Sequence, residues 1–261
     1  MNTDFLKAFP HYFQPESIYL VGCGGTGSYV APTIARLAKH LQKRGKEITV
    51  YFIDPDLVEE KNIWRQNFCY AEVGANKAEA LTARLNHAWG LNIKAIPHHF
   101  KSTRFSHYQT NSLIVGCVDN PEGRQEISRC RAAWLDSGNH FNAGQVLYGN
   151  CKDGKAIKSG LRNTLNIPYL PSPGLQEPQL LESQSLQPAV KRSCADLIEA
   201  DLQSMVINQA MAAIVSTYLY ELLLNKGLKY HATYLNLATM GTTVNWNTKK
   251  SLARYSRRQK S

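Results

Sequence analysis

A glycine-rich turn, GCGGTG at residues 22–27, is the feature that most restricts how this chain can fold. It follows a short apolar run at 17–22 and precedes a stretch from 28 to about 44 whose apolar residues recur at helical spacing. A buried strand, a tight glycine turn and a helix in this order form the phosphate-binding unit of doubly wound α/β folds. Small residues let the backbone approach a phosphate, and the amino terminus of the helix supplies N–H groups. We therefore favour a nucleotide site over a turn without a ligand. The expected site residues are Gly22, Gly24, Gly25 and Gly27.

Strands and helices are predicted to alternate after this turn. Apolar runs indicate strands at 47–54, 92–100 and 112–119, separated by helices at 74–89 and 121–133. A strand–turn–strand unit at 134–150, a helix at 195–224 and strands at 229–237 and 242–246 follow. This order predicts a doubly wound, Rossmann-like and mainly parallel sheet with helices on both faces, extended by antiparallel strands near the carboxyl terminus.

One large domain accounts for most of the 261 residues. We expect it to span 17–247, after an irregular lead-in at 1–16 and before a basic, disordered tail at 248–261. Residues 153–193 hold five of the eleven prolines and show little periodicity, so a long crossover-type loop is predicted there.

Charge and cysteine usage exclude several classes of protein. The net charge is +10, and the last thirteen residues contain six basic residues and no acid. Such a tail either contacts nucleic acid or keeps the end of the chain solvated, and we favour the solvated end. The six cysteines form no C-x-x-C pair, so neither structural zinc nor a disulfide framework is expected. Asn, Gln, Ser, Thr and Glu interrupt the most apolar stretch, 206–224, which favours a core helix in a cytoplasmic protein over a membrane span.

Charged residues gather where the predicted strands end. Asp54 ends the second strand, where a carboxylate commonly binds ribose, and Asp56 either assists it or caps the next turn. Because Asp54 suits NAD and ATP equally, it does not choose between them. Arg65 and Lys77 follow near the expected phosphates, and Asp119 ends a later strand at the same edge of the sheet. Each alone is more often a surface charge or a helix cap. Together they predict a site for ATP and Mg²⁺, because adenylyl transfer needs cations and a metal around the phosphates.

Four blocks of sequence carry a resemblance to a known family. They read GCGGTG, DPDLVEEKNIWRQNF, GANKAEA and CVDNPEGR, in that order. Their pattern resembles the ThiF/MoeB/HesA superfamily, the adenylating fold of ubiquitin-activating enzymes, over about residues 17–145. Within it, the segment SCADLIEADLQSMVINQAMA at 193–212 is most like the ThiF-family protein of PRTRC systems.

The resemblance implies ATP- and Mg²⁺-dependent adenylation of the C-terminal carboxylate of a small ubiquitin-like or sulfur-carrier-like protein, by a homodimer. The glycine turn would hold phosphates and Asp54 the ribose, while Asp119 would bind Mg²⁺. The residues that would surround the triphosphate are Asn62, Arg65 and Lys77. Gln66, Asn120 and Arg124 also match family positions, with less certain roles.

Cys194 has two interpretations that the sequence leaves open. Some family members keep a reactive cysteine at this place, and a helix amino terminus with Lys191 and Arg192 nearby would favour a thiolate that forms a thioester. The alternative is a small buried side chain.

Two features depart from the family, and they keep other functions open. Residues 1–16 contain no arginine, so the arginine that often reaches into a partner subunit is absent or replaced, and the paired zinc motifs are missing. A nucleotide-binding module without catalysis and an enzyme that adenylates a small molecule or tRNA are therefore alternatives. An NAD-dependent oxidoreductase ranks last, because it leaves Asn62, Arg65 and Gln66 unexplained.

Overall fold

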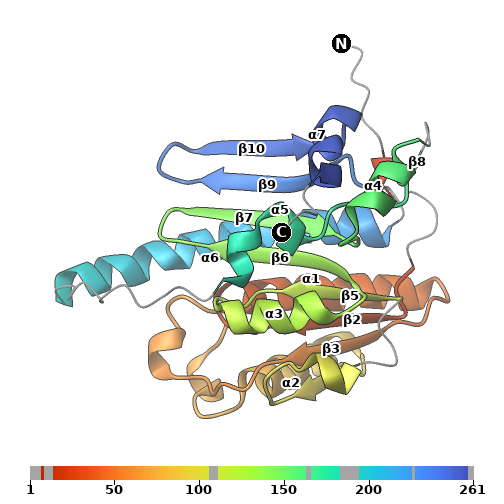
Figure 1. The fold of residues 1–261 in the computed structure, drawn as a ribbon. Coiled ribbons are helices and arrows are strands. Elements are labelled where there is room, and N and C mark those ends of the chain that lie inside the picture. The colour runs from red at the N-terminus through yellow and green to blue at the C-terminus, as the bar shows by residue number, and fades with distance from the viewer. Residues whose placement is uncertain are drawn as a thin grey trace.

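The computed structural model describes residues 7–8, 14–105, 111–162, 166–182, 194–224 and 227–257, with the side chains of 7, 8, 105, 166, 194–205 and 257 outside the description. Its centre is one sheet of eight strands in the order β10-β9-β7-β6-β5-β2-β3-β4 (Figure 1). The parallel strands are β2 (Ser17–Val21), β3 (Thr49–Ile53), β4 (Lys94–Ile96), β5 (Ser112–Gly116) and β6 (Ala133–Asn139). The antiparallel extension consists of β7 (Ala143–Gly149), β9 (Tyr230–Asn236) and β10 (Gly241–Trp246). The predicted fold class is confirmed.

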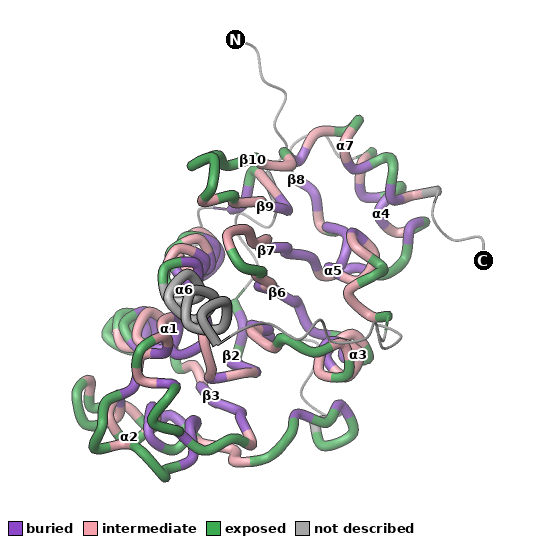
Figure 2. Tube along the Cα trace, turned by 90° about the vertical axis from the view of Figure 1, so that its left-hand side faces the viewer, coloured by how far each residue is buried: buried purple, intermediate pink, exposed green. Residues whose placement is uncertain are grey.

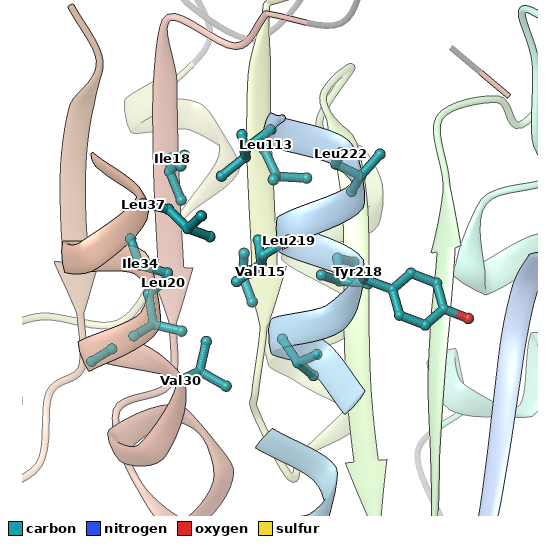
Figure 3. Packing of buried hydrophobic residues seen from close by; sticks show 14 of the residues in the cluster. Ile18, Leu20, Val30, Ile34, Leu37, Leu113, Val115, Tyr218, Leu219 and Leu222 are labelled. Carbon is teal, nitrogen blue, oxygen red and sulfur yellow. The ribbon is translucent and has the colours of Figure 1, made fainter. Parts of the chain in front are cut away.

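Helices cover both faces of this sheet. One face carries α1 (Gly25–Lys43), α2 (Lys77–Trp89) and α6 (Cys194–Leu223), and the other carries α3 (Pro121–Arg129) and α5 (Pro173–Gln176) (Figure 2). Side chains of β2 and β5 alternate between the two cores, so Leu20 packs with α1 and α6 while Val21 packs on the α3 side. Figure 3 shows aliphatic residues of α1, β2, β5 and α6 meeting in the larger core. Each such fully buried aliphatic side chain contributes about 1.5–3 kcal/mol.

Residues 153–193 differ from the predicted long loop. They include α4 (Gly154–Gly160), α5, the 3-10 helix η4 (Pro178–Leu181) and β8 (Asn166–Ile167), which pairs with β1 (Lys7–Ala8) in the lead-in. Two of the five prolines that suggested a loop stand at helix starts, since Pro173 and Pro178 occupy first-turn positions. Residues 163–165 and 183–193 lie outside the described residues.

The basic tail is also folded where it is described, so the expectation of disorder is wrong for 249–257. It forms α7 (Lys249–Ala253) and the 3-10 helix η5 (Arg254–Arg257), and the Thr248 hydroxyl caps α7 by accepting from Ser251 N–H. Leu252 and Tyr255 are buried, at 0% and 3% exposure. These two apolar residues, three apart, hold a single helical turn against the body of the protein. In the part of the chain that the structure describes, no helix combines the length and apolar character that a bilayer crossing needs.

Candidate functional site

Three neighbouring strands end at the same level and place the predicted residues at one edge of the sheet. Val21 of β2 pairs with Ile53 of β3 and with Gly116 of β5. The next peptide groups extend this alignment, because Gly22 N–H donates to the Ile53 carbonyl at 2.9 Å. Asp54, the glycine turn and the segment leading to Asp119 therefore leave the sheet side by side, as doubly wound folds require for a ligand site.

The glycines of the turn are needed for different reasons. Gly22 has φ of 90°, and a Cβ on Gly27 would lie 1.9 Å from the Gly22 carbonyl oxygen, so these two allow the turn to close against α1. A Cβ on Gly25 would lie 2.7 Å from the Asn208 side chain. Gly24 is different, because its nearest neighbour would be the Gln66 side chain at 3.8 Å. Gly24 therefore leaves room for a ligand to approach the backbone.

A cleft of about 2080 Å³ opens at this edge. All but two of the residues predicted for the site line it. The lining set is Gly22, Gly24, Gly25, Asp54, Asp56, Asn62, Arg65, Gln66, Lys77, Asp119, Asn120 and Arg124. Gly27 serves packing instead, and Cys194 begins α6 with its side chain outside the described part of the chain.

Asp54 is a fixed carboxylate at the end of β3. Its Oδ2 accepts from Cys23 N–H at 2.6 Å and its Oδ1 from Asp56 N–H at 2.9 Å. Burial raises the pKa of Asp54, while the two backbone hydrogen bonds and nearby Lys77 oppose that rise. The side chain is thus oriented before any ligand arrives.

Lys77 is a buried cation at the start of α2. Its Nζ donates to Asp56 Oδ2 at 2.9 Å, and the Lys77 side chain is 9% exposed against 64% for Asp56. Asn76 fixes this arrangement: its Oδ1 caps α2 at Ala78 N–H, and its Nδ2 donates to the carbonyls of Asp54 and Asp56. The sequence analysis missed Asn76, although an asparagine just before a helical pattern is a typical cap signal.

The Asn62–Gln66 segment faces the glycine turn across the cleft. Asn62 is buried, and its Oδ1 accepts from Glu59 N–H at 2.9 Å, which shapes the backbone. Gln66 is 8% exposed, and its Oε1 has no hydrogen-bond partner among the described residues. Ser137 also lines the cleft, and its buried Oγ likewise has no hydrogen-bond partner among the described residues. Buried polar atoms usually have a hydrogen-bond partner, so these two atoms fit a site that binds a polar ligand.

Asn208 of α6 joins three parts of the site, and the sequence analysis did not single it out. Its Oδ1 accepts from Asn139 Nδ2 at 2.7 Å and from Thr26 Oγ1 at 3.4 Å, and its Nδ2 donates to the Arg65 carbonyl at 3.3 Å. The available signal was an amide within the apolar stripe of a helix. Such a buried polar group needs partners.

Asp119 and Asn120 are exposed residues at the mouth of the cleft. Asn120 caps α3, since its Oδ1 accepts from Gly123 N–H at 2.7 Å. Among the described residues no three His, Cys, Asp or Glu side chains cluster so as to hold a metal ion. Assignment of Mg²⁺ to Asp119 therefore stays a prediction, and it fits the habit of Mg²⁺ of using one or two carboxylates together with substrate phosphates.

Arg124 of α3 and Asp136 of β6 form a buried ion pair beside the cleft. Arg124 Nε lies 3.3 Å from Asp136 Oδ2, and the residues are 7% and 0% exposed. Burial raises the pKa of Asp136 to about 6, against the opposing effect of Arg124. The sequence analysis found Arg124 but missed Asp136, which is the one acid in the strand sequence AWLDSGN.

Replacing Arg124→Leu is expected to destabilise the protein by about 3–5 kcal/mol near neutral pH, because the Asp136 carboxylate is left buried without its partner. The pKa of Asp136 then rises further above its unfolded value of about 3.9. A carboxyl group whose pKa is higher in the folded state binds its proton more tightly there than in the unfolded state. This stabilises the folded protein fully below the unfolded-state pKa, and the stabilisation is lost as the pH rises through the folded-state pKa. Denaturant unfolding should therefore show a smaller loss at about pH 5 than at about pH 8.

The matched control is Arg124→Leu combined with Asp136→Asn, which removes the buried charge. It should recover much of the stability and lose the pH dependence. An equal loss for Arg124→Leu at both pH values would contradict the assignment of a buried, proton-binding Asp136.

Comparison with known proteins gives the same fold. Human (Homo sapiens) ubiquitin-like modifier-activating enzyme 6 is 31% identical over 137 residues, which are 48% of this chain and 13% of the human enzyme. The structure of E. coli MccB with ATP superposes with a TM-score of 0.56 at 14% identity and covers 90% of this chain and 65% of that one. The structure of PaaA gives 0.55 at 16% identity and covers 92% and 75%.

This chain thus spans less than two thirds of the human enzyme and of MccB. The ThiF family profile, by contrast, matches residues 13–256, which include the whole cleft and nearly the whole described fold. On that match, the chain belongs to the ThiF family.

Proposed function

We propose that this protein is an ATP- and Mg²⁺-dependent adenylyltransferase that activates the C-terminal carboxylate of a small ubiquitin-like or sulfur-carrier-like protein. The observation that carries the proposal is the meeting of the glycine turn with Arg65 and the buried Lys77 in one cleft. A relative's name refers to the activation of ubiquitin-like modifiers. One MccB structure carries ATP, and another carries the analogue AMPCPP together with MccA. These comparisons support the substrate class.

The fit to ATP is supported by the space and by the polar groups. Gly24 has no close neighbour on its open side, and Gln66 and Ser137 bring buried polar atoms that need partners. In our assignment Gly22, Gly24 and Gly25 approach the phosphates, and Asp54 binds the ribose. Asn62, Gln66 and Asn120 complete the polar lining.

The reaction joins the carboxylate oxygen of the acceptor to the α-phosphorus and breaks the bond to the β-phosphate, so that pyrophosphate leaves. An ionised carboxylate is already a nucleophile, and no general base is required. Arg65 and Lys77 supply fixed positive charge where negative charge grows on the leaving pyrophosphate. Mg²⁺, which we assign to Asp119, would neutralise phosphate charge when bound.

Exchange of labelled pyrophosphate into ATP tests the proposal. With ATP, Mg²⁺ and a cognate acceptor, exchange should depend on the acceptor. Lys77→Met should lower it by about 10²-fold, because one preorganised charge is lost. Lys43→Met, which removes an exposed lysine at the end of α1, is the control and should retain activity.

The outcomes separate the alternatives. ATP binding without exchange for any ubiquitin-like or sulfur-carrier acceptor would support a non-catalytic nucleotide-binding module. Exchange driven by a small carboxylate or by tRNA would redirect the substrate class. Each of these outcomes overturns the proposal as stated.

We further propose that the Cys194 thiolate attacks the acyl carbon of the adenylate, so that a thioester forms, the acyl–phosphate bond breaks and AMP leaves. Cys194→Ala should keep exchange and lose any thiol-sensitive conjugate. A conjugate that persists in that variant would refute this role. A homodimer and membership of the PRTRC branch are likewise proposals, which intact mass of the complex with a co-purified partner would test.

A further inference from the structure

Two basic segments that are about ninety positions apart in the sequence lie together at one corner of the fold. Helix α4 packs on η5, since a Cβ on Gly154 would lie 2.9 Å from the Tyr255 carbonyl oxygen and 3.2 Å from Ser256 Cα. Figures 1 and 2 both show α4 and α7 side by side. The corner therefore joins residues 152–162 to residues 249–257.

This corner is at the opposite edge of the sheet from the cleft. Strand β7 runs antiparallel to β6, β9 runs antiparallel to β7, and β10 runs antiparallel to β9. The carboxyl ends of β7 and β10 therefore lie where β2, β5 and β6 begin. Helix α4 follows the end of β7, and α7 follows the end of β10. None of the residues that line the cleft comes from α4, α7 or η5.

Buried polar contacts hold the carboxyl-terminal element in place. His231 of β9 shares hydrogen bonds with Asn247 Oδ1 at 3.0 Å through Nδ1 and with the Tyr255 hydroxyl at 3.3 Å through Nε2. Burial lowers the pKa of His231 to about 4, so the ring is neutral near pH 7. Because Leu252 and Tyr255 are buried as well, α7 and η5 are fixed against the body of the protein.

Most of the excess charge of the chain is in these segments. Residues 152–162 and 249–257 contain eight of the thirty basic residues and one of the twenty acidic ones, which is +7 of the net +10. Lys152 is exposed too, but its Nζ donates to the carbonyls of Ser128 and Cys130. The other exposed cations of the described part, which we call the basic corner, are Lys155, Lys158, Arg162, Lys249, Lys250 and Arg254. None of them forms an ion pair with a described acidic residue.

The α4 side of the basic corner is a row. Lys155 and Lys158 are three apart on α4, where Ile157 is buried, and Arg162 follows two residues after the helix ends. Asp153, the single acid, has its carboxylate engaged in capping Lys155 N–H at 2.8 Å. Tyr169 adjoins the end of this row, because its ring would touch a Cβ on Gly160 at 3.4 Å, and it is 40% exposed.

We infer that the basic corner binds single-stranded nucleic acid, with its cations on the phosphate backbone and Tyr169 stacking on a base. A backbone of regularly spaced negative charges complements a surface with six exposed cations. An exposed aromatic ring beside the cations supplies the stacking platform that such sites use. A lipid surface is disfavoured, because the two described segments expose no large apolar side chain that could enter a bilayer.

Binding of labelled single-stranded DNA and RNA oligonucleotides, a duplex of the same sequence and anionic phospholipid vesicles tests this inference. Between about 50 and 200 mM salt, log affinity for the single strands should fall linearly with log salt concentration. Lys155→Glu with Lys158→Glu should weaken binding at least about tenfold at low salt. Tyr169→Ala should weaken single-strand binding about fivefold or more and leave duplex binding unchanged.

The charge-matched control is Lys43→Glu with Lys94→Glu, on α1 and on the edge strand β4, far along the sheet from β10. It should bind as the unmodified protein does. All variants should keep the melting temperature and pyrophosphate exchange, so this test stands apart from the proposed function. An equal loss in the control, binding that ignores salt, or tighter charge-sensitive binding to vesicles would overturn the inference.

Discussion

Arg65→Ala is expected to lower acceptor-dependent pyrophosphate exchange by about 10²–10³-fold, the usual effect of removing one preorganised group from a charge-stabilising site. The melting temperature should stay nearly unchanged. Asn208 holds this segment through the backbone carbonyl of Arg65, a contact that does not use the guanidinium group. A loss of activity without a loss of stability would therefore be the signature of a residue that acts on the phosphates.

Two further variants sharpen this expectation. Arg65→Lys keeps the charge but loses the planar fork of donors, so it should recover only part of the activity. Arg44→Ala, an exposed arginine just after α1, should have no effect. Exchange within about tenfold of the unmodified protein in Arg65→Ala would refute the phosphate role.

Gly27→Ala is expected to have the second large effect, on folding. Alanine has a higher helix propensity than glycine by about 1 kcal/mol, so propensity alone predicts a gain in stability. The structure predicts a loss of stability instead, because the new Cβ would lie 1.9 Å from the Gly22 carbonyl oxygen and 3.3 Å from Cys117 Cβ. Forced overpacking of this kind costs about 1–3 kcal/mol and displaces the turn from β5.

Gly24→Ala is the matched comparison. Its Cβ would meet only the Gln66 side chain, at 3.8 Å, so the melting temperature should hold while the affinity for ATP falls. Thermal unfolding and nucleotide binding, measured on both variants, separate a packing glycine from a ligand-facing one. An unchanged melting temperature for Gly27→Ala would contradict the structure of the turn.

Local patterns predicted which residues meet at one edge of the sheet. The glycine turn, Asp54, Arg65, Lys77 and Asp119 come from separate segments, yet the alignment of parallel strand ends brings them to one cleft. For the glycine turn, Asp54 and Asp119 that outcome follows from strand–helix alternation. Contacts of Asn208 and Asn76 hold the segments that carry Arg65 and Lys77. Boundaries were less accurate: α2 begins at Lys77, and not at residue 74, because Asn76 caps it.

The missed features depend on contacts between distant segments. Asn208 contacts the Arg65 carbonyl across 143 positions, and nothing near Asn208 in the sequence reports that pairing. In the sequence, Asp136 is only an acidic residue within an apolar strand. Its ion pair with Arg124 forms because α3 packs beside β6. The helical turn at 249–253 is too short for periodicity, and its stability comes from burial of Leu252 and Tyr255 against other elements.

The reversal of chain direction after β6 determines where this protein can accept changes of sequence without an effect on the cleft. It sends α4 and α7, the helices that directly follow β7 and β10, to the far rim of the sheet, and no residue of either helix lines the ATP cleft assigned here. Free-energy changes at well-separated positions without common partners add independently. Relatives could therefore diverge, or engineers could graft new loops, at that rim while the reaction centre keeps its rate.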